Sequence, residues 1–328
     1  MPKLKDTDYL SISTRIRAME NSLLTRERME RMLEARSNEE AAKVLSECGY
    51  GEISTLTPSA LDERLLAARD AVYQDLQSAV PDPNLIHVFR IKYDYHNAKV
   101  LLKCQAVGAQ PERLLAGGGR YAPGALQDAF QRDDLRDCSD AFRKEVAEAR
   151  EVLASSADPQ RSDFILDRAC FAEMSAAAQA TGSEFLMGYV RLQIDAANLR
   201  AAVRAARMER EGDFLSQVLV PGGNVPEKSI ASAKGGDLGL LFRGGPLAQA
   251  AALGASLAAP GSGHLTEFER MCDNALSAAK RVPFGEQTVI GYLHAKEAEL
   301  TAIRIIMTGR LAGLDTETIR ERLRDSYV

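Results

Sequence analysis

The stretch "YDYHNAKVLLK" at residues 93–103 brings together side chains that could do chemistry. Asp94, His96 and Asn97 follow closely on one expected helix, and such groups could bind a metal ion or move a proton. The sequence itself tests this idea, because "IDAANLRAAVR" at 194–204 repeats the pattern with an alanine in place of the histidine. We therefore expect His96 to have no catalytic or metal-binding role.

A second candidate is the string "DDLRD" at residues 133–137. In all-α isoprenoid synthases, a DDxxD run holds Mg²⁺ against a substrate diphosphate, since hard divalent cations prefer carboxylate oxygens. The ligands here would be Asp133, Asp134 and Asp137, but the second carboxylate cluster of such enzymes is absent from the sequence. The other interpretation is structural: Asp133 or Asp134 caps the helix that continues through "LRDCSDAFRKEVAEAREVL". A magnesium-dependent, all-α isoprenoid-diphosphate enzyme remains the alternative hypothesis.

Other signatures of catalysis are missing from the sequence. The glycine clusters lack the spacing of a phosphate-binding loop, and the four histidines include no H-E-x-x-H pair. A G-x-S-x-G nucleophile turn is also absent. The sequence predicts no catalytic residue, no metal site and no cofactor.

The polar pair of the first stretch belongs to an internal repeat. A third, degenerate copy is "AKEAELTAIRII" at 295–306, and successive copies lie 101 residues apart. Members of each pair are three residues apart, so they share one helical face above an apolar stripe. This placement predicts a helix-packing or partner-facing role. The repeat-signature residues are Asp94 and Asn97, Asp195 and Asn198, and Lys296 and Glu299.

The flanking sequence predicts the elements that position these pairs. Each copy follows a turn and an earlier helical stretch, which indicates a helical hairpin: the turns are "VPDPN" (80–84), "TGSEF" (181–185) and "VPFGEQ" (282–287). Glycine-containing breaks come after the hairpins, and short helices should start near Pro123, Pro226 and Asp315.

The first part of the chain carries comparable helix signals. Ser37 and Glu40 have the spacing of a capping box, and Thr57 precedes a proline suited to a first helical position. The expected fold class is all-α, with three similar helical-hairpin domains of about 100 residues. Their predicted bounds are 1–110, 111–210 and 211–328.

Composition sets limits on partners and location. Of 328 residues, 45% are hydrophobic, and the net charge is −5, which gives no electrostatic reason to expect nucleic acid. The five scattered cysteines, without a C-x-x-C, are typical of free thiols in a reducing cytosol. The N-terminal residues lack the apolar core of a signal peptide, and the apolar run at 247–259 is too short to span a bilayer. Any membrane role should be peripheral.

The sequence resembles the C subunit of the bacterial and archaeal V/A-type ATPases, the homologue of the d subunit of the eukaryotic V-ATPases. The resemblance extends from "RIRAMENSLLTRERMERMLEARSNEEAAKVL" through "YDYHNAK" and "IDAANLRAAVR" to the C-terminal run that begins at "FGEQTV". Matching residues in that last run are Phe284, Gly285, Tyr292, Lys296, Glu297, Glu299, Ile303, Arg304, Gly309, Gly313, Ile319, Arg320, Tyr327 and Val328.

This resemblance implies a non-catalytic component of the central stalk, or rotor, of a rotary ATPase. It implies a funnel of three similar domains about a pseudo-threefold axis. The implied partners are the central-shaft subunits and the membrane proteolipid ring, and the implied role is coupling shaft rotation to H⁺ or Na⁺ transport. The protein would lie on the cytoplasmic side of the membrane, held there through the ring. A general helical scaffold is a weaker alternative, separated from this hypothesis by the identity of the partners.

Overall fold

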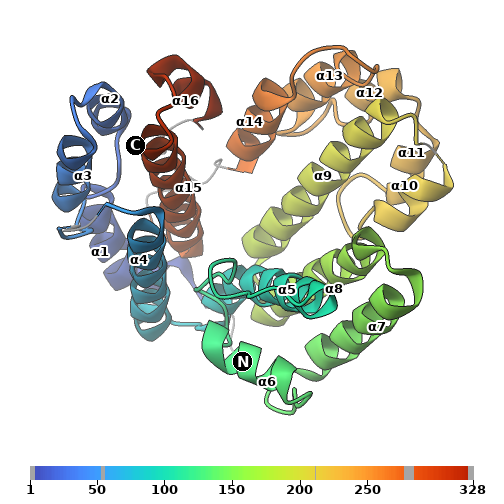
Figure 1. Cartoon of the computed structure of the whole chain (residues 1–328), viewed down its shortest axis with the longest axis horizontal. Helices are drawn as coiled ribbons and strands as arrows, with labels where there is room; N and C mark the ends of the chain where they lie inside the picture. Colours follow the sequence, from blue (N-terminus) through green and yellow to red (C-terminus); the bar gives the residue numbers. More distant parts are fainter. Residues whose placement is uncertain (1–3, 53–55, 211, 277–283, 324–328) are drawn as a thin grey trace. The chain divides into compact units, whose positions relative to one another are not determined.

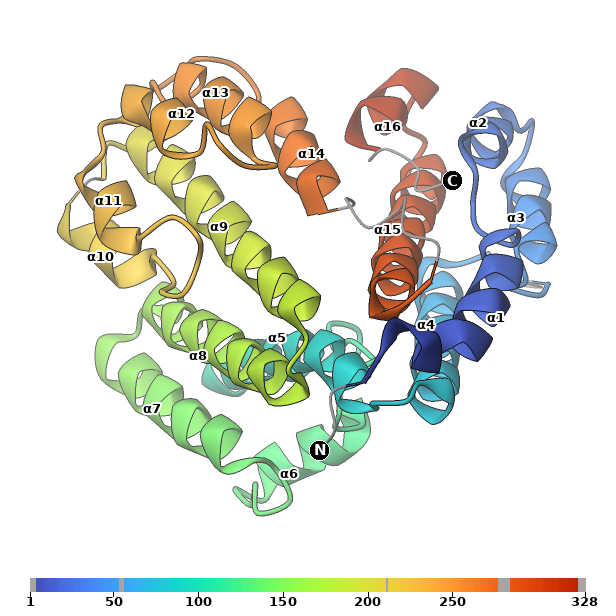
Figure 2. The same cartoon turned by 180° about the vertical axis from the view of Figure 1, so that it is seen from behind.

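The computed structural model describes residues 4–52, 56–210, 212–276 and 284–323. Every regular element in these ranges is a helix, so the all-α prediction is confirmed for them. The chain divides into two compact units (Figures 1 and 2). Unit 1 comprises Met1–Pro81, Arg243–Gly254 and Gly263–Val328; unit 2 comprises Asp82–Phe242 and Ala255–Ser262. The first two residues of the predicted turn at 282–287, and Tyr327 and Val328, lie outside the described residues.

Unit 1 is built around one long helix from the C-terminal part of the sequence, α15 (Glu286–Leu311). Helices from the N-terminal part pack against it, and both views show α15 in red beside blue helices (Figures 1 and 2). These N-terminal helices are α1 (Leu10–Glu20), α2 (Arg26–Glu34), α3 (Asn38–Glu47) and α4 (Pro58–Ala79). The unit also contains the short helix η1 (Asp6–Tyr9), α14 (Thr266–Asn274) and α16 (Thr316–Arg322).

Unit 2 contains two further long helices, α5 (Asn84–Val107) and α9 (Glu184–Arg207). Helix α5 packs along α8 and contacts α6 and α7, while α9 contacts α8, α10 and α11. The bounds of these neighbours are α6 (Pro123–Gln131), α7 (Asp140–Ser156), α8 (Pro159–Thr181), α10 (Asp213–Val218), α11 (Glu227–Ser232), η2 (Gly235–Asp237) and α12 (Leu238–Leu241). Helix α13 (Ala248–Ser256) has residues in both units.

Local signals set most helix starts where the sequence predicts them. The Thr57 hydroxyl accepts a hydrogen bond from the Ala60 N–H at 3.2 Å, and a proline follows at the first helical position. Ser183 caps α9, and Asp315 caps α16 through the Thr318 N–H at 2.9 Å. Helix α6 starts at Pro123, as predicted. These starts are determined by neighbours in the sequence, so they can be predicted without knowledge of tertiary packing.

The capping box of α3 differs in one detail from the expected pattern. Ser37 accepts from the Glu40 N–H at 3.2 Å, as a cap should. The Glu40 carboxylate, however, accepts from the N–H of Arg36, at 2.8 Å, one residue before the cap. The helix start is therefore as predicted, with the reciprocal bond shifted by one residue.

The interior of unit 1 joins residues that are far apart in the sequence. One apolar cluster contains Leu24, side chains of α2 and α3, the first half of α4 and the second half of α15. Met32, Leu45, Ile303 and Ile306 are fully buried within it. Burial of such side chains is the dominant stabilising term in folding.

All five cysteines lie within the described residues and are buried. Each remains a thiol outside any disulfide, which confirms the expectation from their scattered spacing. Burial is ordinary for cysteine, which packs as a small hydrophobic residue.

Candidate functional site

The repeated polar residues of α5 and α9 bind the loops that follow their helices. Asn97 is fully buried, and its carboxamide donates to the Ala116 carbonyl at 2.8 Å. The same carboxamide accepts from the Ala116 N–H at 2.7 Å. One asparagine thus pairs with both backbone polar groups of a single residue, as a neighbouring peptide group would.

The second copy has the same geometry. Asn198 is 1% exposed, donates to the Val220 carbonyl at 2.8 Å and accepts from the Val220 N–H at 2.8 Å. Ala116 and Val220 each begin a glycine-containing loop. We call residues 116–121 the first docked loop and residues 220–225 the second docked loop.

The aspartate of each pair binds the far end of its docked loop. Asp94 accepts from the N–H groups of Arg120 and Tyr121, at 2.9 and 3.3 Å. Asp195 accepts from the Val225 N–H at 3.1 Å and from the Asn224 side chain at 2.8 Å. Each pair therefore holds one loop at two points, the asparagine at its start and the aspartate at its end.

The glycines between these points leave space for the aspartates. A Cβ added to Gly119 would overlap Oδ1 of Asp94, and one added to Gly223 would overlap Oδ1 of Asp195. The preceding residues, Gly118 and Gly222, have φ of +90° and +98°, in the left-handed region that favours glycine. The two loops are therefore alike in conformation as well as in attachment.

Arg120 extends the first docked loop into a partly buried ionic network. Its Nε donates to Asp94 at 2.6 Å, and its Nη1 donates to Glu173 of α8, also at 2.6 Å. The Ser139 hydroxyl donates to the same Glu173 carboxylate at 3.0 Å. Arg90 of α5 donates to the Gly119 carbonyl at 3.0 Å, so the loop is also held on its carbonyl side.

The two carboxylates beside Arg120 have pKa values shifted in opposite directions. Burial raises the pKa of Asp94 above its ordinary value, although the Arg120 charge and hydrogen bond favour its ionised form. Burial also opposes ionisation of Glu173, but hydrogen bonds and charge from Arg120 outweigh it and lower the pKa. Ionisation of Glu173 therefore stabilises the folded state. Ionisation of Asp94 is less favourable in the folded state than in the unfolded chain.

Removing the Glu173 charge should weaken unit 2 in a pH-dependent way. We expect Glu173→Gln to lower the free energy of unfolding by about 1–3 kcal/mol at pH 7, because Arg120 loses a partly buried anionic partner. A lowered pKa gives stability that is present above the ordinary value of 4.5 and is lost as pH falls through the folded-state pKa. Urea unfolding from pH 7 to pH 3.5 should therefore show the difference from wild type narrowing below about pH 4.5. Glu148→Gln, an exposed change on α7, should show little difference at any pH; a constant difference for Glu173→Gln would contradict the assignment.

The third pair differs in chemistry and in what it binds. Glu299 is 4% exposed, and its carboxylate accepts from the Leu24 N–H at 2.9 Å and from the Tyr50 hydroxyl. Lys296 donates to Glu299 at 2.7 Å and lies over the Tyr50 ring, 4.5 Å from its centroid. These partners precede Glu299 in the sequence by 275 residues at Leu24 and by 249 residues at Tyr50.

The enzyme-like residues of the sequence are not arranged as an active site. The His96 Nε2 lies 3.1 Å from the Leu114 carbonyl oxygen, in a contact with the loop after α5. Asp133 pairs with Arg150, and Asp134 pairs with the Arg136 Nε at 2.9 Å. Among the described residues, no group of three or more His, Cys, Asp or Glu side chains could hold a metal ion. The arrangement does not favour the diphosphate enzyme.

The expected cap at Asp133 or Asp134 is wrong. Helix α7 begins at Asp140, and its cap is Ser139, whose hydroxyl accepts from the Phe142 N–H at 3.3 Å. Residues 133 and 134 instead follow the end of α6, with Asp133 in a left-handed conformation at φ 54°. Ser139 is the cap because it lies directly before the first residue of the regular helix, which is the position of an N-cap.

Neutralising both aspartates should therefore have little effect. We expect Asp133→Asn with Asp134→Asn to change the free energy of unfolding by less than about 0.5 kcal/mol, because one partner of each ion pair is 77% exposed. Asp158→Ala is the matched comparison: this aspartate caps α8 through the Gln160 N–H at 2.9 Å, and its loss should cost about 1 kcal/mol. Urea unfolding of both variants checks this, and a larger loss in the double variant than in Asp158→Ala would contradict it.

The sequence interpretation missed the docked loops and their partners. It identified the helical positions but expected a packing or partner-facing surface, whereas Asp94, Asn97, Asp195 and Asn198 contact loop backbone. A usable signal was present: "AGGGRY" and "VPGGNV" lie 104 residues apart, close to the 101-residue step of the helical pairs. Arg120 and Glu173 gave no comparable signal, because Glu173 has no repeated counterpart in the pattern.

The helices themselves do not have the character of membrane spans. In the part of the chain covered by the structure, none combines the length and apolar character needed to cross a bilayer.

The fold and the docked loops define the class of protein: it is all-helical and contains repeats, with buried polar residues that hold loops in place.

The chain matches the ATP synthase (C/AC39) subunit family over residues 12–322 and belongs to that family. It is 23% identical to the C subunit of the V-type sodium ATPase of Enterococcus hirae, over 98% of this chain and 99% of that protein. It is 26% identical to the C subunit of the V-type ATP synthase of Deinococcus radiodurans, over 97% and 91% of the two chains. The corresponding V-type ATP synthase protein of Thermus thermophilus is 24% identical, over 96% and 98%. The resemblance noted in the sequence is confirmed.

Proposed function

We propose that this chain is a non-catalytic part of the central stalk of a V/A-type ATPase, where it couples the rotating shaft to the membrane proteolipid ring. The observation that carries the proposal is the match to C subunits of V-type ATPases and ATP synthases over nearly the full length of both chains. The ion transported by the ring would be H⁺ or Na⁺. The chain would lie on the cytoplasmic side, held to the membrane by contact with the ring.

The binding of loops to buried side chains supports this role. A part that passes torque must resist deformation, and here loops between helices are bound to buried side chains instead of being left free. Buried hydrogen bonds of this kind are costly to break without replacement. Three similar domains about a pseudo-threefold axis remain part of the proposal; the bounds that the sequence predicts for them are 1–110, 111–210 and 211–328.

Partner identity tests the proposal directly. A tagged copy would be purified from gently solubilised native membranes, and every co-purifying chain identified by mass spectrometry, with membranes from untagged cells as the control. We expect the other ATPase subunits, with the proteolipid among them. The purified chain alone should show no ATP hydrolysis. Recovery of the chain alone, or with unrelated enzymes, would overturn the proposal.

A further inference from the structure

Glu299 of α15 binds the N-terminal part of the chain much as the asparagines of α5 and α9 bind their docked loops. Position 299 lies 101 residues after Asn198, in register with it. Its carboxylate accepts from the Leu24 N–H at 2.9 Å, as Asn97 accepts from Ala116 at 2.7 Å and Asn198 from Val220 at 2.8 Å. Three side chains in equivalent register thus each accept a hydrogen bond from one backbone N–H. Each of these N–H groups lies in a segment that leads into a helix.

The elements that follow two of these N–H groups, those of Ala116 and Leu24, are also alike. We call α5, α9 and α15 the core helices. The loop and the helices that pack on a core helix are called its cover. After Ala116, α6 has 9 residues and the long α8 has 23, with α7 between them. After Leu24, α2 has 9 residues and the long α4 has 22, with α3 between them. Helix α5 contacts α6, α7 and α8, and α15 contacts α2, α3 and α4 in the same order.

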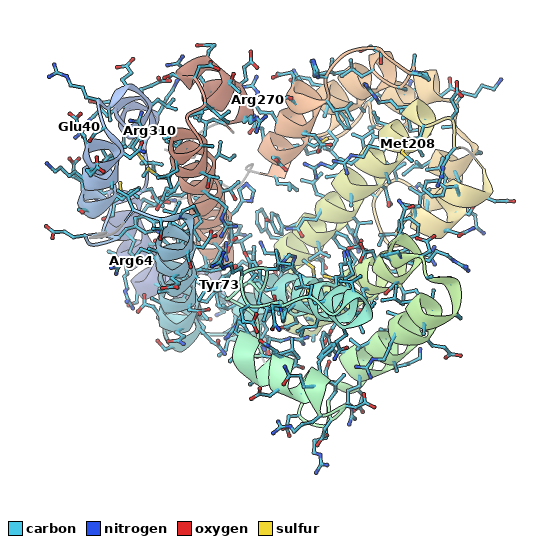
Figure 3. All side chains as sticks on the ribbon, viewed as in Figure 1. Glu40, Arg64, Tyr73, Met208, Arg270 and Arg310 are labelled. Atoms are coloured by element: carbon cyan, nitrogen blue, oxygen red, sulfur yellow. The ribbon has the colours of Figure 1, made fainter. Side chains whose placement is uncertain are left out.

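Further contacts fasten this N-terminal cover to α15 and α16. Arg310, labelled in Figure 3, donates to the carbonyls of Leu33 and Ala35 at the end of α2, each at 2.8 Å. Arg320 of α16 donates to Glu30 of α2 at 2.8 Å. The apolar cluster of unit 1 likewise contains Leu24 together with Ile303 and Ile306.

One difference between the copies has a direct physical reason. In the first docked loop, glycines separate Ala116 from the helix start at Pro123, and Asp94 holds that stretch. In the N-terminal cover, Thr25 follows Leu24 at once and caps α2 through the Arg28 N–H at 3.2 Å. No glycine stretch is present there, so an aspartate at this position would have no loop N–H groups to bind. Lys296 occupies its position and forms an ion pair with Glu299 instead.

We propose that residues 10–79 are the cover of the third core helix, so that the sequence places the cover of α15 first and its core helix last. Glu299 is then the positioning residue of this cover, with Leu24 as its docking point. The grouping does not rest on the proposed function. It replaces the predicted bounds 1–110 and 211–328, because it places residues 10–79 in the same domain as α15. It also explains why Met1–Pro81 and Gly263–Val328 belong to one compact unit.

Backbone hydrogen exchange on the full chain, followed by mass spectrometry, tests the proposal. We expect Glu299→Ala to speed exchange at residues 23–26 by about tenfold or more and to leave residues 112–122 unchanged. Asn97→Ala should do the reverse. The matched control is Glu297→Ala on the same helix, because Glu297 accepts from Tyr73 of α4 at 2.9 Å, outside residues 23–26. It should leave residues 23–26 unchanged.

A conservative variant keeps the test decisive if Glu299→Ala fails to fold. Glu299→Gln retains an oxygen that can accept from the Leu24 N–H, so exchange at residues 23–26 should stay within about threefold of wild type. Unchanged exchange at residues 23–26 in Glu299→Ala would overturn the proposal. So would an equal acceleration of residues 23–26 and 112–122, because the covers would then not be held separately.

Discussion

Gly119→Ala should be among the most destabilising single-methyl additions in this protein, and Gly223→Ala should behave in the same way. We expect each to lower the free energy of unfolding by about 2–4 kcal/mol. The added Cβ would overlap the aspartate oxygen that holds the docked loop, Asp94 in one copy and Asp195 in the other. Neither carboxylate can move away cheaply, because each is buried and accepts backbone N–H groups.

Chemical unfolding of each variant, with wild type alongside, measures this effect. Gly124→Ala is the matched control: it lies in the first turn of α6, and an added Cβ there would meet no atom within 4 Å. That change should be neutral or slightly stabilising, by up to about 1 kcal/mol. In an Asp94→Ala background, Gly119→Ala should lose most of its effect, since the obstructing group is gone. Full additivity of the two changes would contradict the overlap.

Asn198→Asp should also be strongly destabilising at neutral pH, by about 3–5 kcal/mol. The substitution keeps the size of the side chain but removes the donor that binds the Val220 carbonyl at 2.8 Å. It would place an anion against that carbonyl oxygen at a site that is 1% exposed. Burial beside an acceptor should raise the pKa of the new carboxyl group above its ordinary range.

The sign of the pH dependence follows from that raised pKa. Protonation restores a donor, so the loss of stability should be small below about pH 4 and should grow as pH rises through the folded-state pKa. Urea unfolding at pH 4 and pH 7 measures both limits. Asn84→Asp is the control: it is exposed at the start of α5 and should change stability by less than about 0.5 kcal/mol at either pH. A loss for Asn198→Asp that does not depend on pH would show that the donor is not what matters.

The parts of the fold that sequence could predict are those decided by near neighbours. Thr57, Ser183 and Pro123 mark helix starts because caps and prolines act within one turn of their own position. The register of the polar pairs on α5 and α9 was visible for a similar reason, since helical spacing repeats locally. The cap at Asp133 or Asp134 was wrong because two candidates competed with Ser139, and the choice depended on where α6 ends.

The partners of the repeated residues could not be predicted in the same way. Asn97 and Asn198 bind backbone groups of Ala116 and Val220, and a backbone group leaves no mark on residue type. The partner of Glu299 lies in a segment that precedes it by 275 residues, at Leu24. Nothing in the sequence near either residue indicates that they meet.

The order of cover and core helix in unit 1 has a consequence for synthesis on the ribosome. The cover of α5 follows its core helix directly, so Asp82–Phe242 can begin to close as soon as it emerges. Residues 10–79 must instead wait for Glu299 and the rest of α15, about 10–45 s later at ordinary translation rates. During that interval Met32 and Leu45, which are fully buried in the finished molecule, lack the α15 side chains that complete their apolar cluster. We therefore expect the nascent N-terminal segment to expose apolar surface until α15 has been made.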